Sequence, residues 1–410
     1  MHRRRLSALT AVAVLLLAGC ASDAGADAGA RPSLLIWTGG GAGGEATQAL
    51  GARFAEENGV DVKVQIIPED LQTQFVTASQ AGRAPDVVMG AHDWIGNLVQ
   101  NATIDPLQMT DDTKAGYQDL AIKAVTFNGQ VYGMPFTMNN IVLFRNTALV
   151  PAAPTSIEDL VAKGKALKAA GKVDEILALP IGPTGDPYHI NPLFTSGGGY
   201  IFGTKDSGDF DPSDLGVAKP GATAAYAKIR ALGEGGDGAL KRSITADNIL
   251  SLFSSGKAPF MISGPWQLPE LKKTAVKYDI SPVPPFAGGQ PARPFITVDA
   301  AYVASRGTNK ALAQEFVTNF WSRPDVGTSL YAATSSVPAL KEALATVRKD
   351  DAMVGKVSDA GVEFGQIMPS IPAMAVVWDP LGKAEAAVVG GADPGSTITA
   401  AASAIQAQIK

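Results

Sequence analysis

Two hydrophobic periodicities alternate between residues 34 and 89, and this alternation restricts the fold more than any other feature of the sequence. Residues 34–37 and 86–89 are short apolar runs, and residues 60–67 alternate apolar and polar side chains with a period of two. The segments between them, residues 45–58 and 71–81, carry apolar side chains at helical spacing. Strands that alternate with helices in this way are typical of an α/β domain with a largely parallel sheet.

The alternation continues to the end of the chain. A chain of 410 residues that is 46% hydrophobic can form more than one core, so we expect two α/β lobes. Further strands are predicted at 141–144, 177–180, 259–262 and 296–304, and helices at 156–170, 222–233, 245–255, 309–322, 339–349, 352–360, 383–389 and 397–410.

The N-terminus has the pattern of an export signal. Residues 2–5 are basic and residues 6–18 are apolar, and this apolar run is too short for a helix that spans a bilayer, which takes about 20 residues. The sequence Leu17-Ala18-Gly19-Cys20 resembles a bacterial lipobox, in which cleavage precedes the cysteine and the thiol carries diacylglycerol. We therefore predict a signal peptide at 1–19, a lipidated flexible tether at 20–33 and a location on the extracytoplasmic face of the cell membrane. An ordinary signal peptide with an incidental cysteine is the alternative.

The composition excludes several functional classes. The chain has one Cys and three His, which is too few for a disulfide framework or a Cys/His zinc site. Its net charge of −5 does not fit a nucleic-acid surface, which needs a basic stripe. No cofactor, metal or nucleic-acid partner is predicted.

A glycine-rich loop follows the first predicted strand. Gly39, Gly41 and Gly44 satisfy the G-x-G-x-x-G pattern of dinucleotide-binding folds. The acidic residue that this fingerprint needs at the end of the second strand is missing, because Asp61 lies near its start. We therefore interpret the loop as backbone open to a ligand at the end of a strand.

Polar and aromatic side chains also gather at predicted strand ends and loops. Asp93 follows the strand at 86–89, where it can cap a helix that begins at Trp94 or face a ligand. Trp266, Trp378 and Tyr188 lie beside Gly-Pro, Asp-Pro or Pro residues that mark loops. Aromatic rings on loops can stack on the apolar faces of sugars while carboxylates and amides bind the hydroxyl groups. Core packing is the alternative for each ring alone.

Several segments together resemble the extracytoplasmic solute-binding proteins of ABC importers, and among them the maltose/maltodextrin binders. The similarity runs from about residue 34 to residue 410. Its segments are 34–37 with the glycine loop, 82–88 with Ala91-His92-Asp93, 128–135, Asp186-Pro187-Tyr188, 198–200, 260–266, 310–316 and 367–372.

The resemblance implies a two-lobed, type II periplasmic-binding-protein-like α/β fold with three hinge crossovers. One lobe would comprise residues 34–137 plus 301–333, and the other residues 142–295 plus 341–410. The hinges would lie near 138–141, 296–300 and 334–340.

The resemblance also implies ligand-binding positions. Tyr188, Trp266 and Trp378 would stack on sugar rings, whereas Asp93, Asp186, Gln72 and Asn139 would bind hydroxyl groups. The full set is Thr38, Gly40, Gly41, Gln72, Asp93, Trp94, Asn139, Asp186, Tyr188, Trp266, Trp378 and Asp379. The charged residues of the family's first loop are replaced by Gly40 and Gly41, the arginine after the His-Asp pair by Trp94 and the hinge glutamate by Asn139. The sequence thus leaves open whether the sugar is maltose, a maltodextrin, trehalose or another disaccharide, and it assigns no role to His189.

The function expected from this resemblance is sugar transport without catalysis. A monomer, anchored in the membrane through Cys20, would capture a maltose- or maltodextrin-type oligosaccharide by lobe closure and deliver it to the permease subunits of an ABC transporter. An extracellular carbohydrate-active hydrolase with a carboxylate pair such as Asp93 and Asp186 is the alternative, and it needs the two groups about 5–9.5 Å apart. A purely structural surface lipoprotein is a third possibility.

Overall fold

The computed structural model describes residues 31–409, and the chain from Pro32 onward forms one compact unit. The predicted signal peptide, Cys20 and the tether up to residue 30 lie outside the described residues. No helix among residues 31–409 has the length and apolar character that crossing a membrane requires.

The larger sheet is built from strands of distant parts of the chain. Its order is β13-β12-β3-β1-β2, and β6 also pairs with β12. Strand β1 is parallel to β2 and β3, as the sequence predicts, whereas β12 is antiparallel to β3 and β6. The bounds are β1 Ser33–Thr38, β2 Asp61–Ile66, β3 Val87–Ala91, β6 Gly133–Asn140, β12 Phe295–Val303 and β13 Gln366–Ile367.

Helices pack against this sheet and share a buried apolar cluster with it. The helix predicted at 45–58 begins four residues earlier than expected, within the glycine loop, and it buries Leu50 and Phe54. The Phe54 ring contacts the edges or faces of Phe316 and Phe320 at centroid distances of 5.0 and 5.2 Å, so the helix is fixed by aromatic packing. The helices associated with this sheet are α1 Gly41–Asn58, α2 Leu71–Gln80, α3 Ile95–Gln100, α4 Asp111–Ala115, α5 Asp119–Ala124, α11 Lys310–Glu315 and α12 Pro324–Thr334. The 3-10 turn η1 His92–Trp94 precedes α3, and the π-helical turn η4 Phe316–Phe320 follows α11. A hairpin joins β4 Thr126–Phe127 to β5 Gln130–Val131.

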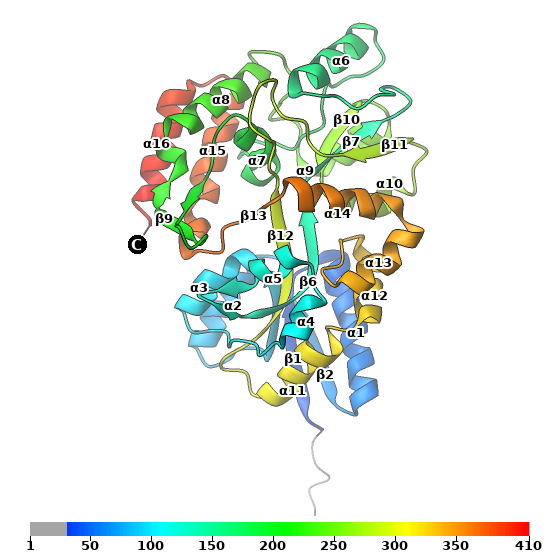
Figure 1. Ribbon diagram of the computed structural model, residues 1–410, viewed down its shortest axis with the longest axis vertical. Coiled ribbons are helices and arrows are strands. Elements are labelled where there is room, and N and C mark those ends of the chain that lie inside the picture. Colours follow the sequence, from blue (N-terminus) through cyan, green and yellow to red (C-terminus); the bar gives the residue numbers. More distant parts are fainter. Residues whose placement is uncertain (1–30, 410) are drawn as a thin grey trace, which may run out of the picture. The chain divides into compact units, whose positions relative to one another are not determined.

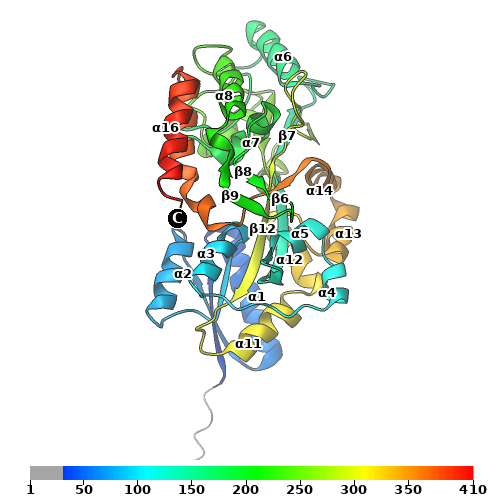
Figure 2. The same cartoon turned by 60° about the vertical axis from the view of Figure 1, so that its left-hand side comes forward.

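The smaller sheet has the order β10-β7-β11 and is antiparallel throughout. Helices α8, α15 and α16 pack on one another (Figure 1), and Figure 2 shows α16 beside α8 from a second direction. The strands of the smaller sheet are β7 Val142–Asn146, β10 Phe260–Ser263 and β11 Tyr278–Ser281. The surrounding helices are α6 Ile157–Ala169, α7 Pro187–Ser196, α8 Pro220–Leu232, α9 Ala246–Ser254, α10 Leu268–Leu271, α13 Lys341–Asp350, α14 Ala352–Phe364, α15 Trp378–Val389 and α16 Pro394–Gln406. This part of the chain also contains the 3-10 turns η2 Gly216–Ala218, η3 Pro265–Gln267 and η5 Pro372–Val376, and the hairpin of β8 Phe202–Thr204 with β9 Phe210–Leu215.

Two expectations about this part of the chain are wrong. The strand predicted at 177–180 is reduced to a single bridge between Ala178 and Met261, because Pro180 has no N–H group with which to extend a ladder. The smaller sheet is also not parallel: β7 follows β6 after one residue and runs antiparallel to both neighbours. Hydrophobic periodicity does not encode strand direction.

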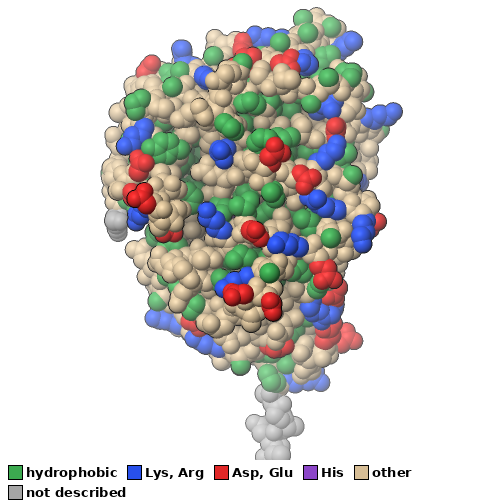
Figure 3. Space-filling view, viewed as in Figure 1, with side chains coloured by type: hydrophobic (Ala, Val, Ile, Leu, Met, Phe, Trp, Pro, Cys, Tyr) green, Lys and Arg blue, Asp and Glu red, His purple; other side chains and the backbone are tan. Residues whose placement is uncertain are grey.

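The chain passes between the two sheets close to where the site lies. Strand β6 ends at Asn140 in the larger sheet, and β7 begins at Val142 in the smaller one (Figure 1). It returns from β11 to the larger sheet at β12. Basic and acidic side chains are interspersed on the face drawn in Figure 3. Several charged side chains of the described residues form ion pairs, such as Arg323 with Glu57 at 2.7 Å.

Candidate functional site

Three adjoining cavities lie at the ends of the strands, and they share lining residues. The glycine-loop cavity (about 980 Å³) shares Trp266, Asp299 and Ser336 with the aromatic cavity (about 530 Å³). A third one, the Asp93 cavity (about 240 Å³), shares Trp378 with the aromatic cavity. The three cavities are therefore contiguous.

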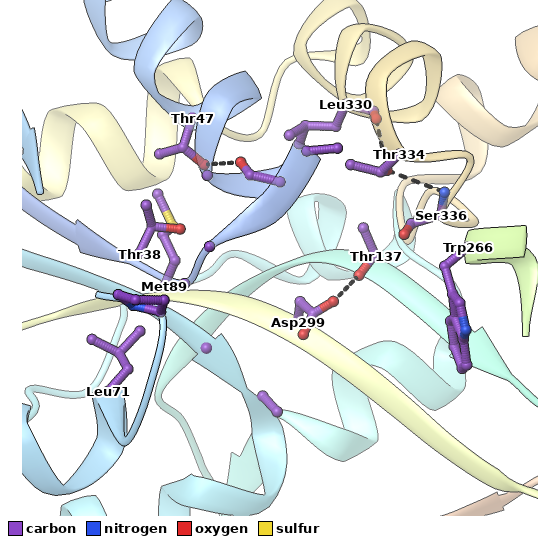
Figure 4. A pocket seen from close by; sticks show the side chains of 18 of the residues that line it. Thr38, Thr47, Leu71, Met89, Thr137, Trp266, Asp299, Leu330, Thr334 and Ser336 are labelled. Carbon is purple, nitrogen blue, oxygen red and sulfur yellow. Dashed lines mark hydrogen bonds between the residues drawn. The ribbon is translucent and has the colours of Figure 1, made fainter. Parts of the chain in front are cut away.

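The glycine-loop cavity lies at the N-termini of two helices, α1 and α2. It is lined by Thr38 at the end of β1, by the glycine loop and by Gln72 in the first turn of α2, and Figure 4 shows several of its side chains. Neither α1, with N-cap Gly40, nor α2, with N-cap Asp70, has a side-chain cap hydrogen bond. The first N–H groups of a helix have no partner within the helix, so uncapped N-termini offer donors to a ligand.

Three aromatic rings surround the aromatic cavity. The ring centroids of Tyr188 and Trp266 lie 6.4 Å apart. Phe295 lies between Tyr188 and Trp378, with its ring centroid 6.2 Å from each of theirs. The Trp266 side chain is exposed to 38%, an unusual exposure for an indole in a folded domain. Asn139 of β6 also lines this cavity, and its Oδ1 accepts the backbone N–H of Val337 at 3.1 Å.

The two tryptophans that line the glycine-loop cavity, Trp94 and Trp266, fold back over glycines. A Cβ atom on Gly264 would lie 2.2 Å from Cζ3 of Trp266, and one on Gly90 would lie 2.0 Å from Cζ3 of Trp94. Each ring therefore lies against a strand end that carries no side chain. Trp94 lines the glycine-loop cavity and the Asp93 cavity.

Asp93 has an unused acceptor at the site. It lines the Asp93 cavity, and its Oδ1 atom is buried with no hydrogen-bond partner among residues 31–409. Burial, reinforced by the carboxylate of Asp299, raises the pKa of Asp93 to about 7. The expectation that Asp93 caps the helix after it is wrong: it lies inside the 3-10 turn His92–Trp94, and the N-cap of α3 is Trp94, without a side-chain bond.

His92 fixes the strand end that carries Asp93. Its Nδ1 accepts the backbone N–H of Val298 at 3.1 Å, so Nε2–H donates to the carbonyl of Met368 at 3.0 Å. Burial lowers the pKa of His92 to about 4, which keeps the imidazole neutral. The residue is therefore a structural link between β12 and the segment after β13.

Three of the predicted site residues do not line any of these cavities. Gly41 is an exposed residue of the loop, with φ +70°. Asp379, in the first turn of α15, is exposed and pairs with Lys383 at 2.8 Å. Asp186 is the N-cap of α7, and its carboxylate accepts hydrogen bonds from the backbone and the ring of His189. Since Asp186 does not reach the cavities, the pair of Asp93 and Asp186 that a hydrolase would need is not assembled there.

The structure adds polar residues that sequence reasoning missed. Asp299 lies at an irregularity of β12, where the register to β6 shifts, and its Oδ2 accepts the hydroxyl of Thr137 at 2.7 Å. Burial raises the pKa of Asp299. Thr297 and Ser336 complete the polar lining of the aromatic cavity. A lone carboxylate inside the apolar run 296–304 was a signal that could have identified Asp299.

Known proteins resemble this chain over most of its length. The model of the family "Bacterial extracellular solute-binding protein" matches residues 49–354. A galactooligosaccharide-binding protein of Bacillus subtilis (strain 168) is 30% identical over 371 residues, which cover 88% of this chain and 85% of the relative. A maltodextrin-binding protein of the same organism is 29% identical, covering 82% and 80%. A maltooligosaccharide ABC transporter solute-binding lipoprotein of Streptococcus pneumoniae (strain ATCC BAA-255 / R6) is 28% identical, covering 74% and 71%.

These matches agree with the two sheets and with a site that binds rather than catalyses. The chain belongs to the bacterial extracellular solute-binding proteins, a family of extracytoplasmic binding proteins rather than enzymes, and has their two-lobed, type II periplasmic-binding-protein-like fold.

Proposed function

We propose that this protein captures a maltodextrin-type or related glucosidic oligosaccharide by lobe closure and delivers it to the permease subunits of an ABC importer. The observation that carries the proposal is the aromatic cavity, in which Tyr188, Trp266 and Trp378 present their rings beside polar groups. Flat aromatic rings complement the apolar faces of sugar rings, and this combination is typical of carbohydrate sites. The names of the relatives, which are galactooligosaccharide, maltodextrin and maltooligosaccharide binders, support the same ligand class.

Hydroxyl groups of the sugar would find partners on several sides of the cavities. The free Oδ1 of Asp93 accepts hydrogen bonds, and the uncapped N–H groups of α1 and α2 donate them. Gln72 and Asn139 provide amide groups. Because a buried polar group without a partner is costly, a sugar with a wrongly placed hydroxyl group would bind more weakly.

The mechanism would be a shift of population toward the closed form. The glycine-loop cavity is lined by the loop after β1 of the larger sheet and by Trp266 after β10 of the smaller sheet. A sugar that contacts both lobes stabilises the form in which they approach each other. We propose lobes of residues 34–137 plus 301–333 and 142–295 plus 341–410, with hinges near 138–141, 296–300 and 334–340.

The protein would act as a monomer, held at the outer face of the cell membrane by a lipid on Cys20. Mass spectrometry of the protein from membranes of its host would reveal a diacylglyceryl group on an N-terminal Cys20. Replacing Cys20 by Ser should release the protein from the membrane fraction.

A thermal-shift screen tests the ligand class. A sugar that binds the native state alone raises the melting temperature by mass action, by an amount that grows with its concentration over Kd. The set should contain maltose, maltotriose, maltotetraose, trehalose, cellobiose and a galactooligosaccharide. No shift with any of them would refute the proposal, and a product of hydrolysis in the mixture would favour the enzyme instead.

A further inference from the structure

Asp186 and His189, at the start of α7, form a closed pair behind the aromatic cavity. One carboxylate oxygen of Asp186, Oδ1, accepts the backbone N–H of His189 at 3.1 Å. The other, Oδ2, accepts from the ring Nδ1–H of the same histidine at 2.7 Å. Both oxygens are thereby directed at His189 and not at a cavity, which explains why Asp186 is absent from the lining.

The start of α7 is itself fixed on α15. The buried carboxyl of Glu385 accepts the backbone N–H of Asp186 at 3.1 Å through Oε1. Burial, reinforced by the nearby Asp186 carboxylate, raises the pKa of Glu385 well above its ordinary value. The preceding turn also touches α15, since a Cβ on Gly185 would lie 1.9 Å from the carbonyl oxygen of Gly382. The backbone that carries Asp186 therefore has little room to move.

The imidazole of His189 contacts two of the cavity rings with its edge or face. It lies 6.0 Å from Trp266 at an interplanar angle of 87°, and 5.5 Å from Tyr188 at 78°. Its Nε2 is buried without a hydrogen-bond partner among residues 31–409, so hydrogen bonding fixes the ring through Nδ1 alone. Edge-to-face contacts of this kind favour one mutual orientation of the rings.

We propose that Asp186 and His189 are positioning residues that hold Trp266 and Tyr188 in the orientation needed for stacking on a sugar, without touching the sugar themselves. The inference rests on the proposed function for the identity of the ligand. Trp266 needs such support because its side chain is partly exposed and protein contacts restrain only part of it. Without Asp186 the imidazole loses its hydrogen bond and can turn about χ2, and the contact with both rings is lost.

A double-mutant cycle separates positioning from ligand contact. Calorimetry with maltotriose should compare the wild type with Asp186→Ala, Trp266→Ala and the double variant. Asp186→Ala should raise Kd by about tenfold, as expected for loss of an oriented aromatic platform. Residues that act through each other give non-additive effects, so the double variant should bind at least about fivefold better than the product of the two single losses predicts. An outcome closer to the product would overturn the proposal, because Asp186 would then act on binding independently of Trp266.

Asp393 offers a matched control for the loss of a helix cap. It is the N-cap of α16, precedes a proline and accepts the backbone N–H of Ser396 at 2.9 Å, as Asp186 does for His189. Asp393→Ala should lower the melting temperature by a similar amount and leave the Kd for maltotriose unchanged. An equal loss of affinity in this control would assign the effect of Asp186→Ala to general destabilisation and overturn the proposal.

A ligand-free measurement keeps the proposal independent of the sugar. In ¹H–¹⁵N spectra, the indole resonance of Trp266 is the one that disappears in Trp266→Phe. It should shift in Asp186→Ala more than those of Trp37 and Trp321, which pack in the core of the larger sheet. An unshifted Trp266 resonance would overturn the proposal whatever the cycle gives. If the wild type binds no saccharide, the proposed function is refuted. The spectrum still tests whether Asp186 holds the Trp266 ring in place. Should Asp186→Ala not fold, His189→Leu takes its place in both experiments.

Discussion

Replacing Gly264 by alanine should weaken sugar binding although no ligand-contacting side chain is changed. The Cβ of the alanine would lie 2.2 Å from Cζ3 of Trp266, whereas ordinary contacts begin at 3.4 Å, so the indole would have to move by about 1.2 Å. Gly264 has φ −108° and ψ −178°, an extended conformation that alanine adopts without strain. The substitution therefore acts on the ring and not on the backbone.

The expected magnitude follows from the worth of one stacked ring. Stacking on an aromatic ring contributes about 0.5–1.5 kcal/mol, and each 1.4 kcal/mol corresponds to a factor of ten in affinity. Gly264→Ala should therefore raise the Kd for maltotriose by about 2- to 12-fold. Isothermal titration calorimetry measures this change, and circular dichroism checks that the fold is retained.

A glycine with free space around it provides the control. A Cβ on Gly235 would have no heavy atom within 4 Å, and its φ is not left-handed. Gly235→Ala should leave both the Kd and the melting temperature near the wild-type values. If folded Gly264→Ala bound maltotriose within twofold of the wild type, the Trp266 ring would not be the stacking surface that we infer.

Three further predictions concern single side chains of the site. Trp378→Ala should weaken oligosaccharide binding by about 10-fold in calorimetry without unfolding the protein, and an unchanged Kd would remove this ring from the site. Burial lowers the pKa of His92 to about 4, so its contribution to the free energy of unfolding is complete above pH 6.5 and is lost as the pH falls toward 4. His92→Gln should flatten this part of the pH dependence of chemical denaturation, and a curve of unchanged slope would contradict the assignment. Burial raises the pKa of Asp93 to about 7, so its contribution is complete below pH 3.8 and is lost as the pH rises through 7. Asp93→Asn should remove that loss, and the same titration measures it.

The sequence predicted those parts of the fold that depend on local periodicity. Strand β2 and helix α2 lie within one or two residues of the expected bounds, because each buries one face with a regular spacing. Strand direction in the smaller sheet was not predictable in this way. The strand expected at 177–180 failed because an apolar run shows burial but not ladder pairing.

The candidate site was predicted in part, and its two aspartates show why. Asp93 and Asp186 both follow from the resemblance; Asp93 lies inside a 3-10 turn and Asp186 is the N-cap of α7. Only Asp93 has a free oxygen at a cavity, because His189, three residues after Asp186, turns that carboxylate away. Asp299 stands out as a lone carboxylate in an apolar run, but its place at the cavity depends on a register shift between β12 and β6, which no local pattern records.

The two tryptophans of the glycine-loop cavity are placed in the same way, each after a strand of a different sheet. Trp94 lies in the 3-10 turn after β3, and Trp266 lies in the 3-10 turn after β10. In each case a glycine shortly before the tryptophan leaves the strand end bare, and the indole lies against it. Because any side chain at these glycines would displace the ring, the bare strand end and the exposed indole depend on each other. The glycine-loop cavity is lined by both rings, one from each sheet, so a ligand there would have an aromatic surface from either lobe. Bringing those two surfaces onto one oligosaccharide would then require the lobes to approach, which links the stacking geometry directly to closure.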